Sequence, residues 1–159
     1  MRDPEPIPPA KLEGADSSPC PPRILIIEDE LLIALMITEM LRDLGYRVSG
    51  VAHTIPMATR EFAKRNYDAV LLDINIGGQY HARTADSLAK SGTPFAFVTG
   101  YDYLVDPRHE NVPILQKPFT SAHLRALLEA LVGPRALKQV NAQVGRLSNA
   151  KTPGSRPGF

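Results

Sequence analysis

The sequence predicts a doubly wound α/β fold, in which helices cover both faces of a single parallel sheet. Apolar runs at residues 24–27, 69–72 and 95–98 lack polar alternation, which is typical of strands buried on both faces. Strand and helix patterns alternate along the chain through short links, which favours parallel crossovers. Polar residues follow each buried run, at the sheet edge where folds of this class bind their ligands.

Length and composition indicate one domain. The chain has 159 residues, of which 43% are hydrophobic, enough for one ordinary core but not comfortably for two. Its 18 Lys and Arg residues nearly balance 17 Asp and Glu residues, so no global charge points to nucleic acid as the partner. Cys20 is the sole cysteine, which excludes an internal disulfide. The longest apolar run, residues 31–37, is too short to cross a bilayer, so we expect a soluble, cytoplasmic protein without membrane contact.

Two tails are expected to flank the domain. Residues 1–22 are rich in proline and charged residues, a composition that buries too little apolar surface to order the chain. Residues 134–159 carry basic residues and no acidic one, and their few apolar positions are too sparse for a further domain. We therefore predict a disordered tail at 1–22, a domain at 23–133 and a flexible basic tail at 134–159.

The first half of the domain is predicted to hold three strands and two helices. A strand at 24–27 leads to a helix at 31–44, which has acids in front, where they complement the helix dipole, and Gly45 behind. Residues 46–52 alternate as a more exposed strand does, and a helix at 55–66 has Pro56 in its first turn. The next strand, at 69–72, ends in Asp73, and residues 74–78 are expected to form a turn.

The second half is predicted to hold two strands and up to three helices. A helix at 79–91 ends near Gly92, and a strand at 94–99 ends in a hydroxyl. A helix at 101–112 is expected to be short or mobile, because Pro107 interrupts it. A strand at 113–116 and an amphipathic helix at 120–132 complete the domain. The flavodoxin-like arrangement is the simplest one for this order of elements.

The helix at 31–44 has more apolar surface than one sheet contact can cover. Seven consecutive apolar residues, 31–37, go all the way round it. Either the helix packs deeply beneath a tail, or it offers a docking surface to another protein.

Charged and polar side chains are predicted to converge at the carboxyl edge of the sheet. Asp73 alone could be no more than a loop cap, but Glu28 and Asp29 follow a neighbouring strand, with Thr99 and Lys117 at the ends of two others. Three adjacent carboxylates repel one another, and one lysine cannot neutralise them all, so the site needs a cation. Hard oxygen ligands suit Mg²⁺ better than Zn²⁺. A carboxylate beside Mg²⁺, with a lysine and a hydroxyl, is equipped to receive a phosphoryl group.

Four motifs in this order resemble the receiver domain of two-component response regulators. They are Ile26-Ile27-Glu28-Asp29-Glu30, Leu71-Leu72-Asp73, Val98-Thr99-Gly100 and Gln116-Lys117-Pro118-Phe119. Each motif alone is weak, but together, each at a strand end, they are a strong signal over roughly residues 23–132. The resemblance implies a CheY-like receiver fold and a phosphoprotein of phosphorelay signal transduction rather than an enzyme.

The resemblance assigns roles to six residues. Asp73 would be the phosphoacceptor and a ligand of Mg²⁺, and Asp29 would bind the ion directly. Glu28 would act through water and Asn75 through its backbone carbonyl. Lys117 would pair with Asp73 and then with the phosphoryl group, whereas Thr99 would take a phosphoryl oxygen and couple it to the fold.

The sequence resembles one subclass of receiver domains more closely than receivers in general. The run Phe95-Ala96-Phe97-Val98-Thr99-Gly100-Tyr101 is similar to the FAT GUY subclass, whose fourth helix is often loosely formed and whose partners are typically histidine kinases of the HWE or a related type. Gly77 stands where many receivers have proline, which also fits the subclass. Ile114 occupies the position of the aromatic residue that rotates in most receivers, so the resemblance implies no aromatic switch here.

Three functions are compatible with the sequence. In the first, a stand-alone receiver takes a phosphoryl group from a phosphohistidine on a histidine kinase or phosphotransferase, which docks near the helix at 31–44. It then acts on a downstream protein partner or as a phosphate sink. Thr99 and residues 100–112 are expected to change conformation on phosphorylation. The alternatives are a nucleic-acid regulator that uses the basic tail and an interaction module that is never phosphorylated. No role is assigned to Cys20, His53, His81, His109 and His123, which are expected at the surface or in a tail.

Overall fold

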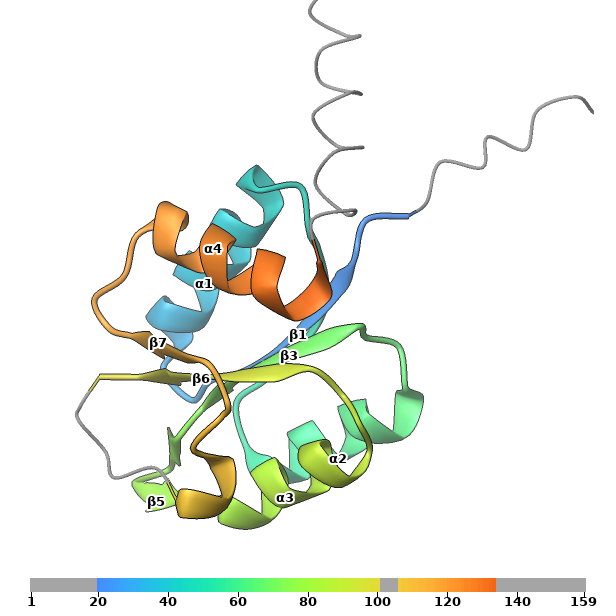
Figure 1. Cartoon of the computed structure of the whole chain (residues 1–159), viewed down its shortest axis with the longest axis vertical. Coiled ribbons are helices and arrows are strands. Elements are labelled where there is room, and N and C mark those ends of the chain that lie inside the picture. Colours follow the sequence, from blue (N-terminus) through green and yellow to red (C-terminus); the bar gives the residue numbers. More distant parts are fainter. Residues whose placement is uncertain (1–19, 101–105, 134–159) are drawn as a thin grey trace, which may run out of the picture.

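The structure, a computed structural model, describes residues 20–100 and 106–133. Five parallel strands form its main sheet in the order β2-β1-β3-β6-β7, which confirms the predicted doubly wound α/β class (Figure 1). A separate antiparallel hairpin is formed by β4 and β5. The elements are β1 (Arg23–Ile27), α1 (Leu31–Asp43), β2 (Arg47–Ala52), α2 (Ile55–Lys64), β3 (Ala69–Asp73), β4 (Asn75–Ile76), β5 (Gln79–Tyr80), α3 (Ala82–Lys90), β6 (Phe95–Thr99), the 3₁₀ helix η1 (Pro107–His109), β7 (Ile114–Gln116) and α4 (Ser121–Val132).

Two hydrophobic cores lie on the two faces of the sheet. Helices α1 and α4 cover one face, and α2 and α3 cover the other (Figure 1). Successive side chains of β1 alternate between the cores: Ile24 and Ile26 pack with α1 and α4, whereas Leu25 and Ile27 pack toward α2 and α3. Burial on both faces explains why residues 24–27 of this strand are all apolar. In the part of the chain that the structure describes, no helix has the length and apolar character needed to cross a membrane.

The register of the sheet aligns the carboxyl ends of its strands. Ile27 at the end of β1 lies beside Leu72 of β3, so Glu28 comes next to Asp73. Asp73 in turn lies beside Val98 of β6, and Thr99 lies beside Gln116 of β7. The residues that follow these strands therefore meet at one edge, as expected for a parallel sheet.

The prediction for residues 74–91 was partly wrong. Residues 75–80 form a hairpin rather than a plain turn, with Asn75 paired to Tyr80 and Ile76 to Gln79. The two residues between them, Gly77 and Gly78, have φ values of 62° and 77°, as a two-residue type I′ turn requires. Helix α3 consequently begins at Ala82, three residues later than the predicted start.

The predicted helix at 101–112 is short in its described part. Residues 101–105 lie outside the described residues, as do 1–19 of the predicted first tail and all of 134–159. Over 106–112 the chain forms only η1, which begins at Pro107 and is capped by the Asp106 side chain through a hydrogen bond from the Arg108 amide. Proline suits the first position of a helix, where its missing amide hydrogen costs nothing.

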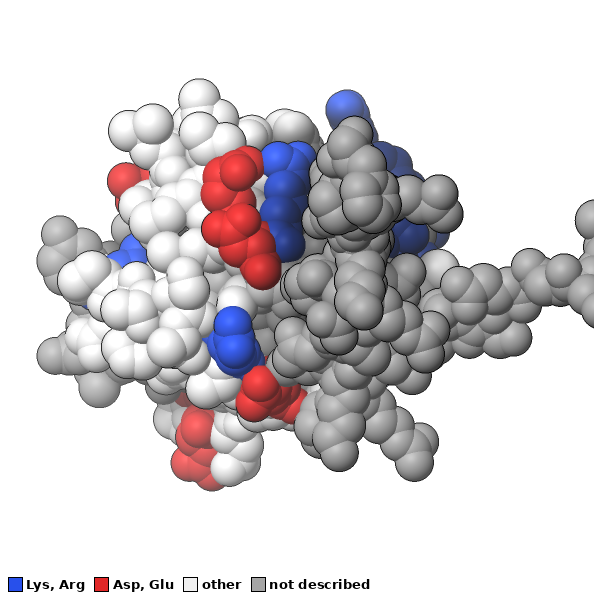
Figure 2. Space-filling view, turned by 90° about the horizontal axis from the view of Figure 1, so that it is seen from above, with Lys and Arg blue, Asp and Glu red and all other residues white. Residues whose placement is uncertain are grey.

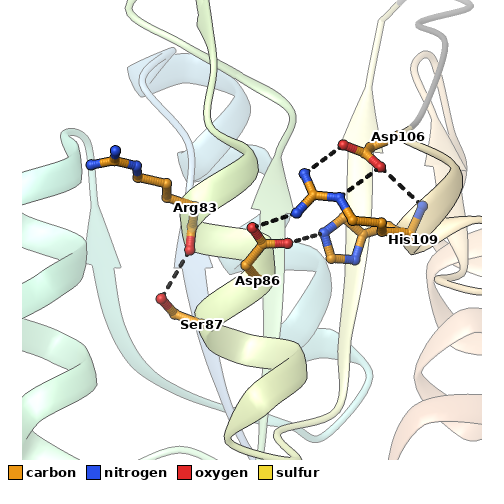
Figure 3. Close-up of polar contacts among 6 residues, drawn as sticks. Arg83, Asp86, Ser87, Asp106 and His109 are labelled. Carbon is orange, nitrogen blue, oxygen red and sulfur yellow. Dashed lines mark hydrogen bonds and ion pairs between the residues drawn. The ribbon is translucent and has the colours of Figure 1, made fainter.

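His109 is buried, contrary to the prediction that it lies at the surface. Its side chain is 4% exposed, and its ring meets the edges of Phe95 and Phe97 on β6. Figure 3 shows Nε2 of His109 directed at Asp86 on α3, to which it donates over 2.9 Å, while Arg108 donates to the other oxygen of the same carboxylate. Asp86 thus holds η1 onto α3. The other four residues without an assigned role are exposed or half-buried.

Replacing Asp86 by alanine should lower the free energy of unfolding by about 1–3 kcal/mol, because the buried His109 nitrogen loses its acceptor. Glu39→Ala is the matched control, since Glu39 only forms an exposed pair with Arg42 on α1, and such pairs contribute about 0.5 kcal/mol or less. Urea unfolding followed by circular dichroism measures both. Equal losses in the two variants would contradict the structural role of Asp86.

Candidate functional site

Three carboxylates meet where β1 and β3 end. Glu28 and Asp29 follow β1, and Asp73 is the last residue of β3. One carboxylate oxygen from each residue lies within 4.8 Å of those from the others. Glu28 and Asp73 are buried, with 1% and 6% of their surfaces exposed, whereas Asp29 is half-buried. The acidic cluster predicted at the sheet edge is therefore present.

The Lys117 ammonium bridges two of these carboxylates. Its Nζ donates to Oε2 of Glu28 over 2.7 Å and to Oδ2 of Asp73 over 2.9 Å. Glu30 lies farther away, at 3.9 Å. The backbone of Lys117 is fixed by a 2.6 Å hydrogen bond from its amide to the Thr99 carbonyl, and a cis peptide joins Lys117 to Pro118. The end of β7 thereby holds the lysine over the ends of β1 and β3.

Burial and charge move the pKa values at this site. Burial is the main cause that raises the pKa of Glu28 to about 7; the Lys117 hydrogen bond opposes this shift, and the Asp73 carboxylate adds to it. For Lys117, burial alone would lower the pKa, but its hydrogen bonds to Glu28 and Asp73 outweigh burial and raise the pKa above its ordinary value. Lys117 thus stays charged, whereas Glu28 resists ionisation until a further positive charge arrives.

The hairpin that sequence reasoning missed supplies backbone donors to the other two acids. The Asn75 amide donates to Oδ1 of Asp73 over 2.8 Å, and the Gly77 amide donates to Oδ2 of Asp29 over 2.7 Å. The glycine pair in the sequence indicates a tight turn. Nothing in the sequence indicates which carboxylate the turn would face.

The donor set fits Mg²⁺. Carboxylate oxygens close together, without a nearby cysteine, suit a hard cation that keeps part of its water shell. One ammonium faces three acids, so the described residues leave an excess of negative charge that a divalent ion would offset. Glu28, Asp29 and Asp73 would hold the ion, and the Asn75 backbone carbonyl would be a fourth ligand. Thr99, which is 4% exposed, ends the neighbouring strand β6.

A groove of about 430 Å³ opens beside Lys117. Its lining combines α1 with the segments that follow β6 and β7: Glu30, Ile33, Met36, Gly100, Lys117, Pro118 and Phe119. Next to it, the outer face of α1 exposes Leu31, Leu32 and Leu35 by 68%, 79% and 55%. Three residues of the apolar run predicted on this helix are therefore exposed. Whether a tail covers them depends on residues outside the described part of the chain.

The chain belongs to the response regulator receiver domain family, whose model matches residues 24–129. The predicted resemblance and the receiver fold are both confirmed. The FAT GUY subclass is compatible with this match but is not distinguished by it.

Similar proteins include regulators and solved receivers. The phyllosphere-induced regulator PhyR of Methylorubrum extorquens is 33% identical over 110 residues, 66% of this chain and 41% of PhyR. The transcriptional regulatory protein PdtaR of Mycobacterium tuberculosis is 29% identical over 80% of this chain and 65% of PdtaR. The solution structure of SdrG from Sphingomonas melonis Fr1 has a TM-score of 0.64 and 38% identity, over 70% of this chain and 97% of SdrG. The chain therefore spans less than two thirds of the curated relatives it matches.

The stability of the metal-free protein should depend on Glu28 between about pH 4.5 and pH 7. In this range the folded state keeps a proton that the unfolded state has released, because folding raises the pKa of Glu28 from 4.5 to about 7. Rising pH therefore destabilises the wild type through this residue, by no more than about 3 kcal/mol. Glu28→Gln should remove that dependence. Urea unfolding in a chelator, at several pH values between about 5 and 8, compares the two; identical pH profiles would contradict the shift.

Proposed function

We propose that the protein is a phosphorylatable receiver, which takes a phosphoryl group from a phosphohistidine onto Asp73 in a Mg²⁺-dependent reaction. The observation that carries this proposal is the contact between the Lys117 ammonium and Asp73, 2.9 Å apart, inside a cluster of acids that suits a divalent cation. Transfer of a phosphoryl group requires positioning and neutralisation of charge more than covalent assistance. This constellation supplies both.

Each residue has a defined part in the transfer. An Asp73 oxygen forms the new O–P bond while the N–P bond of the phosphohistidine breaks, and the electron pair of that bond returns to the imidazole. The Lys117 ammonium moves from the Asp73 carboxylate to a phosphoryl oxygen. The Thr99 hydroxyl donates a hydrogen bond to a second phosphoryl oxygen. The magnesium ion, when bound, neutralises charge on the phosphoryl oxygens. Lys117 remains protonated throughout, because its raised pKa lies above the physiological range.

The phosphodonor docks on α1 in this proposal. The exposed Leu31, Leu32 and Leu35 give that helix an apolar outer face, and the groove beside Lys117 leads from the helix to the site. Exposed apolar patches of this kind usually mark protein contacts. The donor we propose is a histidine kinase, of the HWE or a related type, or a histidine phosphotransferase.

The output runs through a protein partner or through drainage of phosphoryl groups. Thr99 and the segment that follows it are the responding elements we propose, since η1 is the only regular structure between β6 and β7 among the described residues. Ile114, which is 49% exposed, is not an aromatic side chain that could turn inward. Two relatives support a receiver that is activated at its acceptor site and acts on a protein. SdrG has a BeF3-activated conformation, and PhyR of Bartonella quintana is described as an anti-anti-sigma factor.

A nucleic-acid function gains no support from the described residues. Its basis was the basic segment 134–159, which lies outside them. Where the face in Figure 2 is not covered by grey atoms, acidic and basic side chains lie in small neighbouring groups. An interaction module that never takes phosphate is disfavoured, because every position of the acceptor site has a competent residue.

Wild-type protein incubated with Mg²⁺ and a small phosphodonor should form an acid-stable, hydroxylamine-labile adduct, as an acyl phosphate does. Asp73→Asn should abolish the adduct completely, because an amide oxygen is a poor nucleophile. Asp68→Asn is a matched control: Asp68 is an aspartate at the opposite end of β3, paired with Arg23, and its loss should leave the adduct intact. Intact-mass spectrometry before and after hydroxylamine gives the measurement. An adduct that persists on the Asp73 variant would overturn the proposal.

A further inference from the structure

Two backbone amides of the β4–β5 hairpin each contact a carboxylate of the site. Asn75 and Gly77 are two positions apart, and their amides donate to Asp73 and Asp29 respectively. Asp73 is the last residue of β3, whereas Asp29 lies two residues beyond the end of β1. The hairpin therefore connects two acids that are far apart in the sequence.

The hairpin is held in place independently of these contacts. Ile76 is buried in the core beneath it, with 4% of its surface exposed, and its carbonyl contacts Nε2 of His81 at 2.9 Å. The pairs Asn75–Tyr80 and Ile76–Gln79 close the ladder around Gly77 and Gly78. Because Gly77 lies in the turn and not in the ladder, its amide is available for a side chain.

Asp29 differs from the other two acids of the site. Lys117 donates to Glu28 and Asp73, whereas the hydrogen bond described for the Asp29 carboxylate comes from Gly77, over 2.7 Å. A bond from an amide to an ionised carboxylate is stronger than a bond between neutral groups. It engages Oδ2, and no hydrogen bond from another described residue engages Oδ1, which faces no competitor among them for a cation. Groups that orient a metal ligand in this way commonly govern metal affinity.

We infer that Gly77 is a positioning residue, whose backbone amide fixes the Asp29 carboxylate for the divalent cation. This inference rests on the proposed Mg²⁺-dependent function and adds to it. Proline has no amide hydrogen and cannot adopt a φ of 62°. The link therefore requires a residue other than proline at this position. A Cβ at position 77 would meet nothing within 4 Å, so space is not the reason for the glycine.

Three variants separate the amide from the turn. Gly77→Pro removes the donor and disrupts the turn, whereas Gly78→Pro disrupts the same turn, where φ is 77°, without touching an acid of the site. Gly77→Asn keeps the amide, and Asn is among the residues that best tolerate positive φ. We expect Gly77→Pro to raise the Mg²⁺ dissociation constant roughly tenfold. Gly77→Asn should leave it close to the wild-type value, and Gly78→Pro, which keeps the amide of residue 77 but disrupts the turn, should raise it clearly less than Gly77→Pro does. Calorimetric titration of the full chain with Mg²⁺ alone measures all three. Equal weakening by the two proline variants, or unchanged affinity in Gly77→Pro, would overturn the inference.

A second measurement requires neither metal nor phosphate. In ¹⁵N,¹³C-labelled, metal-free protein, the hydrogen bond should give a scalar coupling between the Gly77 nitrogen and Cγ of Asp29. Absence of that coupling in the wild type would overturn the positioning role while leaving phosphorylation of Asp73 untouched. A wild type that shows the coupling but does not bind Mg²⁺ would instead overturn the proposed function and the metal-positioning role with it.

Discussion

The contact of one ammonium with two buried carboxylates is the interaction on which the site depends. Lys117 Nζ lies 2.7 Å from Glu28 and 2.9 Å from Asp73, and only 14% of its side chain is exposed. Loss of one member of such a group leaves the others buried without compensation, which is costly. Even when complete, the group of one lysine and three acids keeps excess negative charge. That excess both destabilises the metal-free site and prepares it for a cation.

Topology brings these groups together without any local signal. β1, β3 and β7 are far apart in the chain, but parallel pairing aligns their carboxyl ends within one layer. The two cores pack these strands closely from both faces, which keeps Glu28 and Asp73 side by side despite their repulsion. A raised pKa such as that of Glu28 is common at functional sites. Fold and chemistry are thus linked through the register of the sheet.

The sequence predicted what depends on periodicity and missed what depends on tertiary contacts. Strands such as β1 and β3, buried on both faces, could be predicted because each contains four consecutive apolar residues, 24–27 and 69–72. The three acids and Lys117 could be predicted as site residues because they lie at the ends of predicted strands. The hairpin was missed, since a Gly-Gly pair flanked by only two paired residues on each side resembles an ordinary loop. His109 was misjudged because its burial depends on Asp86 and two phenylalanines elsewhere in the chain.

Backbone groups supply much of what the side chains cannot. The amides of Asn75 and Gly77 orient two acids, and the Thr99 carbonyl fixes the lysine backbone. Because these contacts use backbone atoms, the residue types do not indicate them, except for Gly77, which indicates the turn. A receiver with the same acidic residues but a different loop after β3 would therefore differ in its affinity for the cation.

The central claim is that the acidic pocket accepts a phosphoryl group only when a divalent ion offsets its charge. Fluorine-19 NMR of the wild type with beryllofluoride, a phosphoryl mimic, tests this directly. We expect a bound fluoride resonance in the presence of Mg²⁺ and its loss on chelation, because Lys117 alone cannot balance three acids and an added anion. A bound resonance of equal intensity without any divalent ion would contradict it.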